Sequence, residues 1–134
     1  MEISAVLVSR ANSLETVVRT NGQDKSLSLP PRKDGPGCAL NGGELLMAAL
    51  ATCYCNDLYR EARKRGIDVR AVEVTVKGQF GAEGEPGSHF QYRVNVDAPC
   101  SLEEIDQLIR ETDRQAEIHN TLRKGCPVAL VDSF

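Results

Sequence analysis

The sequence contains no tryptophan, only three tyrosines and three phenylalanines, and no long hydrophobic run. Its longest uninterrupted apolar stretch, Leu45–Ala51, has seven residues, whereas a helix needs about 20 to cross a bilayer. The first residues, Met1–Ser4, include no basic residue and lead to no cleavage site of small residues. We therefore expect no membrane partner and no secretory signal, and a location in the cytoplasm.

An excess of positive charge is also missing. Lysine and arginine number 16 against 19 aspartates and glutamates, which gives a net charge of −3. Because affinity for nucleic acid comes mainly from Lys and Arg neutralising phosphates, this balance argues against a general nucleic-acid binder. A chain of 134 residues is of a size to form one domain, 1–134, with a core that needs no covalent staples.

The five cysteines are an odd number, which does not suit a disulfide framework. In a reducing compartment such thiols serve packing or chemistry. Cys53 and Cys55 fall on one expected helix, and a Cys-x-Cys pair on a helix is a poor basis for a tetrahedral metal site. We expect neither a bound metal nor another cofactor.

The pattern of apolar residues predicts an α+β fold. Short segments rich in β-branched or alternating residues indicate strands, and two capped segments with helical periodicity indicate helices. The expected strands cover 3–8, 14–20, 26–29, 71–80, 89–97 and 127–131. The expected helices cover 42–65, closed by Gly66, and a later helical region that opens after Ser101 and ends at Gly125.

The first expected helix has an unusual distribution of apolar residues. Asn41 and Glu44 have the spacing of a capping box at its start. Residues 45–51 are then apolar on every side of the helix, while its second half is mostly polar. So small a chain offers no obvious cover for such a segment. A partner subunit could supply it, so we expect a homodimer.

The start of this helix resembles a known family. Residues 43–53 read GELLMAALATC, which is similar to the E-L-L-x-A-A-L-x-x-C signature of the OsmC/Ohr family. Residues 66–69 and the valine-rich strand that follows also fit the family pattern. The resemblance implies an OsmC-like α+β fold in which antiparallel sheets wrap around central helices in an intertwined homodimer.

The same resemblance implies a chemistry. OsmC and Ohr proteins reduce organic hydroperoxides with a reactive cysteine on this helix, which corresponds by position to Cys53. Its thiolate attacks the peroxide, becomes a sulfenic acid and condenses with a second cysteine, and an external dithiol reduces the resulting disulfide. The resemblance therefore implies a thiol-dependent peroxidase in oxidative-stress defence.

The partners of Cys53 are less defined. In one register Cys126, followed by Pro and Val, is the resolving cysteine; in the other, His119–Leu122 matches the family segment and the second cysteine is missing. The Ohr branch takes an arginine from the N-terminal strands, and Arg19 or Arg10 lies near that position. Glu44 caps its helix, in a region that also lines the family's pocket.

Each candidate has a plain structural interpretation as well. Cys53 lies about three turns into its helix, too far from the N-terminus for the dipole to activate it, so a reactive thiol here needs a nearby Arg or His. His119 continues the inward stripe of the later helix and is either a hydrogen-bonded core residue or a base near the thiol. The alternative function is a non-catalytic homodimer that binds a small apolar ligand and lacks the resolving cysteine.

Overall fold

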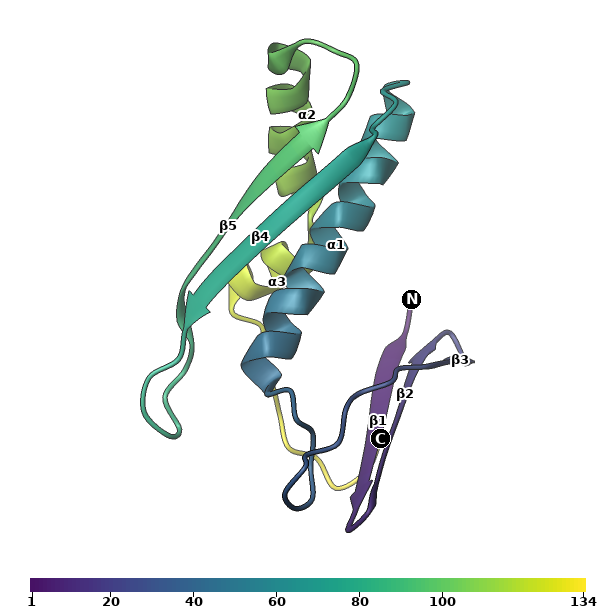
Figure 1. The fold of residues 1–134 in the computed structure, drawn as a ribbon, viewed down its shortest axis with the longest axis vertical. Helices are drawn as coiled ribbons and strands as arrows, with labels where there is room; N and C mark the ends of the chain where they lie inside the picture. The colour runs from purple at the N-terminus through teal and green to yellow at the C-terminus, as the bar shows by residue number, and fades with distance from the viewer. The chain divides into compact units, whose positions relative to one another are not determined.

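A computed structural model describes all residues, 1–134, which form two compact units, Met1–Leu45 and Leu46–Phe134. Along the chain, three strands are followed by one helix, two strands and two further helices (Figure 1). The strands are β1 (Ile3–Arg10), β2 (Ser13–Thr20), β3 (Gln23–Ser26), β4 (Ala71–Gln79) and β5 (Ser88–Asp97). The helices are α1 (Gly42–Lys64), α2 (Leu102–Gln115) and α3 (Glu117–Lys124).

The first unit is an antiparallel sheet in the order β1-β2-β3. The β2–β3 turn consists of Asn21 and Gly22, both with positive φ, as a two-residue hairpin turn requires. Because this turn lets pairing resume at once, with Thr20 opposite Gln23, β3 begins at Gln23 and ends at Ser26. The expectation of a strand at 26–29 was therefore wrong in its position.

The second unit packs its helices against the β4–β5 hairpin. The predicted alternation is confirmed, because the valines of both strands pack against the buried core while their sequence neighbours face outward. The core itself comes from α1, α2 and the junction between α2 and α3. Its buried members are Tyr54, Leu58, Ala62, Leu108 and Ala116.

The helix boundaries largely follow the caps seen in the sequence. At the start of α1 the backbone N–H of Glu44 donates to Asn41 Oδ1 at 2.9 Å, and that of Asn41 donates to Glu44 Oε2 at 2.8 Å. Gly66, at φ 66°, follows the end of α1, and Ser101 caps α2 in a second capping box. The expected later helix is divided, because extended Ala116 (φ −68°, ψ 102°) separates α2 from α3.

The segment after α3 forms no regular element. Gly125 ends α3 in the left-handed conformation, as expected, but residues 127–131 form no strand. The predicted strand is wrong because the segment pairs with no strand edge and so gains no ladder hydrogen bonds. The side chains of Val128 and Leu130 are accordingly fully exposed.

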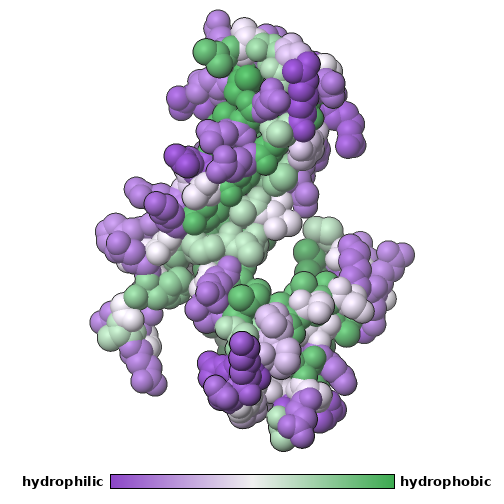
Figure 2. Space-filling model, viewed as in Figure 1, coloured by the Kyte–Doolittle hydropathy of each residue, from purple (hydrophilic) through white to green (hydrophobic).

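The first half of α1 remains incompletely covered. Leu46 and Met47 are half-buried, and Ala48 and Ala49 are exposed. Figure 2 shows this apolar surface in green over α1. No helix combines the length and the hydropathy that a membrane span needs.

Candidate active site around Cys53

Cys53 places its half-buried thiol on the side of α1 that faces the start of α3. The Cys53 Sγ donates to Asp57 Oδ2, one helical turn further on, at 3.5 Å. From α3, the backbone N–H of Ile118 is directed at the thiol. A backbone N–H from the first turn of α3 therefore reaches this sulfur, which the sequence pattern did not indicate.

Asp57 belongs to a small network of charged groups. Its side chain is buried, and Arg60 Nη1 lies 2.9 Å from its Oδ1. The same Arg60 Nη1 lies 3.5 Å from Glu117 Oε1 at the first position of α3. Asp57 Oδ1 therefore faces a guanidinium, while Asp57 Oδ2 faces the thiol.

The electrostatics of this network disfavour a free thiolate. Burial raises the pKa of the Cys53 thiol; the Ile118 N–H opposes that rise, and the charges of Asp57 and Glu117 add to it. Burial also raises the pKa of Asp57, with a further rise from its hydrogen bond to Glu117, whereas the pKa of Glu117 is lowered, first by its own backbone N–H. Of these two carboxyl groups, Asp57 is therefore the weaker acid.

This neighbourhood differs from the expected one. A reactive thiol at this position was expected to have an Arg or His beside it, but the side chain bonded to Cys53 is a carboxyl group, which in turn contacts Arg60. Arg60, in the polar second half of α1, was not among the expected site residues. The spacings i,i+4 from Cys53 to Asp57 and i,i+3 from Asp57 to Arg60 were visible signals, because such residues share a helix face.

His119 lies inward, as its place in the stripe predicted, with 6% of its surface exposed. Its ring packs edge-on against Tyr92, with centroids 4.6 Å apart, and against Tyr54 at 5.8 Å. Neither ring nitrogen has a hydrogen-bond partner. His119 is thus a core residue, as in one of the two expected alternatives, but without a hydrogen bond, and no hydrogen bond links it to the Cys53 thiol.

The environment of His119 makes stability depend on pH. Burial lowers the pKa of His119, followed by the charge of Arg123, so the unfolded chain binds its proton more readily than the folded chain. The free energy of unfolding is then highest above about pH 6.5 and declines as pH falls towards the folded pKa.

The variant His119→Phe keeps an aromatic ring against both tyrosines but cannot titrate. We expect urea unfolding to show a smaller loss of stability between neutral and acidic pH for this variant than for wild type. His89→Asn, at the exposed histidine with φ 53°, is the matched control and should keep the wild-type dependence. Parallel pH curves for wild type and His119→Phe would contradict this account.

The other cysteines are all free. Cys126 is exposed and lies beyond the end of α3, and its role as the resolving cysteine stays a prediction. Cys55 lines a hollow with Val72 and Val74 of β4, so it faces a different element from Cys53. The thiols of Cys55 and Cys53 therefore do not share a site on α1.

The two candidates from the N-terminal region have local partners. Glu44 completes the capping box at the start of α1. The Arg19 guanidinium donates to both carboxylate oxygens of Asp24 on β3, with Nη2 at 3.0 Å from Oδ2, and this bond raises the pKa of Arg19. Both residues belong to the first unit and Cys53 to the second. A role for either in thiol chemistry stays a prediction.

Three side chains of the site carry atoms of the kind that bind metals. One ligand atom each from Cys53, Asp57 and Glu117 lies within 4.8 Å of the others. However, the Arg60 guanidinium already contacts both carboxylates, so both already have a cationic partner. We do not identify these residues as metal ligands.

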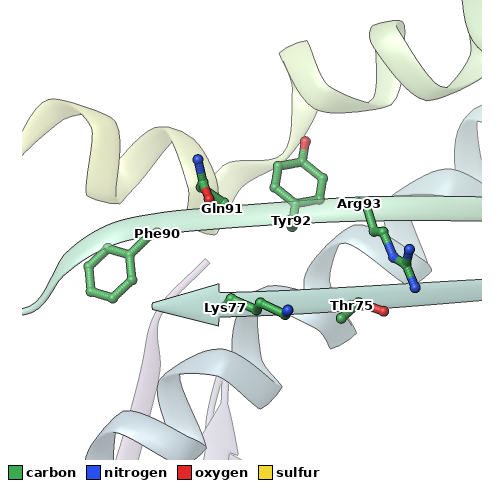
Figure 3. Close-up of a pocket in the computed structure, with 6 residues that line it drawn as sticks. All are labelled: Thr75, Lys77, Phe90, Gln91, Tyr92 and Arg93. Carbon is green, nitrogen blue, oxygen red and sulfur yellow. The ribbon is translucent and has the colours of Figure 1, made fainter. Parts of the chain in front are cut away.

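Two of the hollows against the β4–β5 hairpin differ in size and character. The larger, of about 760 Å³, is lined by six residues of the hairpin, including Lys77 and Arg93 (Figure 3). The smaller, of about 370 Å³, has mostly apolar walls, with Leu50 of α1 and Leu122 of α3 among them, and His119 at its border. The smaller hollow has the apolar character typical of small-molecule sites.

Known proteins share this architecture. Among solved structures, an OsmC-like protein from Mycoplasma pneumoniae superposes with a TM-score of 0.63 at 20% identity, over 91% of this chain and 86% of that chain. An OsmC-like protein of unknown function from Vibrio cholerae gives 0.59 at 15% identity, over 90% and 93%. An organic hydroperoxide resistance protein OsmC from Legionella pneumophila gives 0.53 at 21% identity, over 88% and 89%. These similarities confirm the OsmC-like α+β fold.

The sequence itself leads to the same family. No curated protein sequence matches it. Residues 34–131, however, match the family model described as OsmC-like protein, a range that contains α1 with Cys53 and continues beyond α3. The chain therefore belongs to the OsmC-like protein family.

Proposed function

We propose that the protein is a thiol-dependent peroxidase that reduces organic hydroperoxides, with Cys53 as its nucleophile. The observation that carries this proposal is the Cys53 thiol on α1, with a proton acceptor, Asp57 Oδ2, at 3.5 Å and the Ile118 N–H directed at the sulfur. Membership of the OsmC-like family, which has a structural relative described as an organic hydroperoxide resistance protein, supports it.

The reaction runs in two halves. The Cys53 sulfur attacks one peroxide oxygen, the O–O bond breaks, and the products are a sulfenic acid on Cys53 and an alcohol. A second thiol, from Cys126 or from an external molecule, then displaces water to form a disulfide. An external dithiol reduces that disulfide and returns Cys53 to its thiol.

The working unit in this proposal is a homodimer in the cytoplasm. The uncovered apolar surface of α1, which includes half-buried Leu46 and exposed Ala48 and Ala49, supports a second copy as its cover. Five free thiols are in keeping with a reducing compartment.

The direct test is multiple-turnover reduction of cumene hydroperoxide by the intact protein with dithiothreitol as reductant. We expect peroxide consumption that is proportional to protein concentration and that exceeds the rate with dithiothreitol alone. Consumption equal to the protein-free rate would overturn the peroxidase proposal.

A second candidate, a binding protein without covalent chemistry, is favoured by one specific observation. The pKa of the Cys53 thiol is raised, mainly by burial, whereas a peroxidatic thiol is ordinarily activated by a lowered pKa. The hollow of about 370 Å³ beside His119 offers a mostly apolar site for a small ligand. Saturable binding of cumyl alcohol, together with no peroxide turnover, would favour this candidate.

A further inference from the structure

The Asp57 carboxyl group is held in a fixed orientation beside the reacting sulfur. Oδ1 of Asp57 lies 2.9 Å from Arg60 Nη1, which leaves Oδ2 facing the Cys53 Sγ at 3.5 Å. The side chain is 6% exposed, so water has little access to compete for the thiol proton. A carboxylate oxygen bonded to a thiol is placed to receive its proton.

We propose that Asp57 is the general base of the peroxidase reaction, taking the proton of the Cys53 thiol and delivering it to the leaving alkoxide. This inference rests on the proposed function. As the S–O bond forms and the O–O bond breaks, sulfur is oxidised to the sulfenic acid and the peroxide is reduced to the alcohol. The thiol proton ends on the alcohol oxygen, and Asp57 is again a carboxylate.

The charges around the site explain why a base is needed. The groups that act on the thiol and on Asp57 are Arg60 from α1 and Glu117 from α3, whereas the strands β4 and β5 present valines to the helices. A thiolate formed in advance would lie beside two carboxylates and be repelled by both. Moving the proton onto Asp57 while the S–O bond forms avoids that arrangement.

The acidity of Asp57 suits this role. Burial and the hydrogen bond to Glu117 raise the pKa of Asp57 above its usual range, which makes its carboxylate a stronger base than an exposed aspartate. The carboxylate form must be present for the reaction. The peroxide rate should therefore rise as pH passes the pKa of Asp57, below the pH at which the thiol itself ionises.

Two rates measured on the intact wild-type protein test the proposal. Alkylation by iodoacetamide, read on the Cys53 peptide by mass spectrometry, follows the thiolate alone. Oxidation of Cys53 by cumene hydroperoxide, followed by stopped flow, also requires the base. We expect oxidation to rise at a lower pH than alkylation. Superimposable pH curves would overturn the role of Asp57 while leaving the peroxidase proposal intact, and absence of oxidation at every pH would overturn both.

The variant Asp57→Asn distinguishes a role of Asp57 as proton acceptor from a purely electrostatic effect of its negative charge on the thiol. Loss of the base should slow oxidation by about a hundredfold, while loss of the negative charge should speed alkylation of Cys53. An Asp57 that only suppresses the thiolate would give faster oxidation as well, which would overturn the proposal. Asp106→Asn is the matched control, because Asp106 is exposed on α2 and bonds only Arg110, at 2.7 Å. If Asp57→Asn does not fold, the pH curves of alkylation and oxidation measured on the wild-type protein still test the proposal.

Discussion

Cys53→Ser is expected to consume organic hydroperoxide no faster than buffer. The serine hydroxyl lacks the nucleophilicity of a thiol, and a carboxyl group such as Asp57 cannot ionise it at neutral pH. The substitution removes one sulfur from a half-buried position and keeps a donor for Asp57 Oδ2. The fold should therefore survive, and circular dichroism of the variant should match wild type while turnover with dithiothreitol is lost.

Cys55→Ser is the matched control for this loss. Cys55 lies on the same helix and is half-buried like Cys53, but it faces β4 rather than α3. We expect Cys55→Ser to keep turnover within about twofold of wild type, since it touches none of the groups around Cys53. Equal activity of wild type and Cys53→Ser would remove Cys53 from the mechanism altogether.

Arg60→Gln is expected to slow peroxide reduction on the acid side of its pH profile and to move that limb by about 1–3 pH units, because an opposite charge at this range lowers a carboxyl pKa by about 1–3 units. Arg60 lies 2.9 Å from Asp57 Oδ1 and opposes the rise in the pKa of Asp57. Without it the pKa of Asp57 rises further and less carboxylate is present on the acid side of the profile. The acid limb of the pH–rate profile should move to higher pH, which stopped-flow oxidation measures.

Arg110→Gln is the matched control for Arg60→Gln. Arg110 also bonds an aspartate on its own helix, with Nε 2.7 Å from Asp106 Oδ2, but both side chains are exposed. We expect an unchanged pH–rate profile for Arg110→Gln, because an exposed pair of this kind contributes little and touches no part of the site. A rate loss of equal size in both variants would mean that the effect of Arg60 is not local to Asp57.

The elements that sequence analysis predicted well are those whose signals are local. The capping pairs Asn41–Glu44 and Ser101–Glu104 lie three residues apart, and the valines of β4 alternate along a single strand. Two strand predictions were wrong, because the position of a strand depends on its pairing with a neighbour as well as on its composition. The strand β3 begins as soon as its turn allows, and residues 127–131 have no edge to pair with.

The candidate site could be predicted only in part. The position of Cys53 on α1 follows from the family signature, and Asp57 and Arg60 share its helix face by spacing alone. Glu117 and the Ile118 N–H reach the site because the helical region is interrupted at Ala116. Neither a glycine nor a proline in the sequence marks this interruption. The lack of hydrogen-bond partners for His119 likewise depends on how Tyr54 and Tyr92 pack around it.

The most direct test of Cys53 as the peroxidatic thiol is to trap its oxidised form. The wild-type protein is treated with one equivalent of cumene hydroperoxide in the presence of dimedone, which alkylates sulfenic acids, and the modified cysteine is located by peptide mass spectrometry. We predict a dimedone adduct on Cys53 that is absent without peroxide. An adduct confined to another cysteine, or no adduct and no disulfide that includes Cys53, would contradict the account.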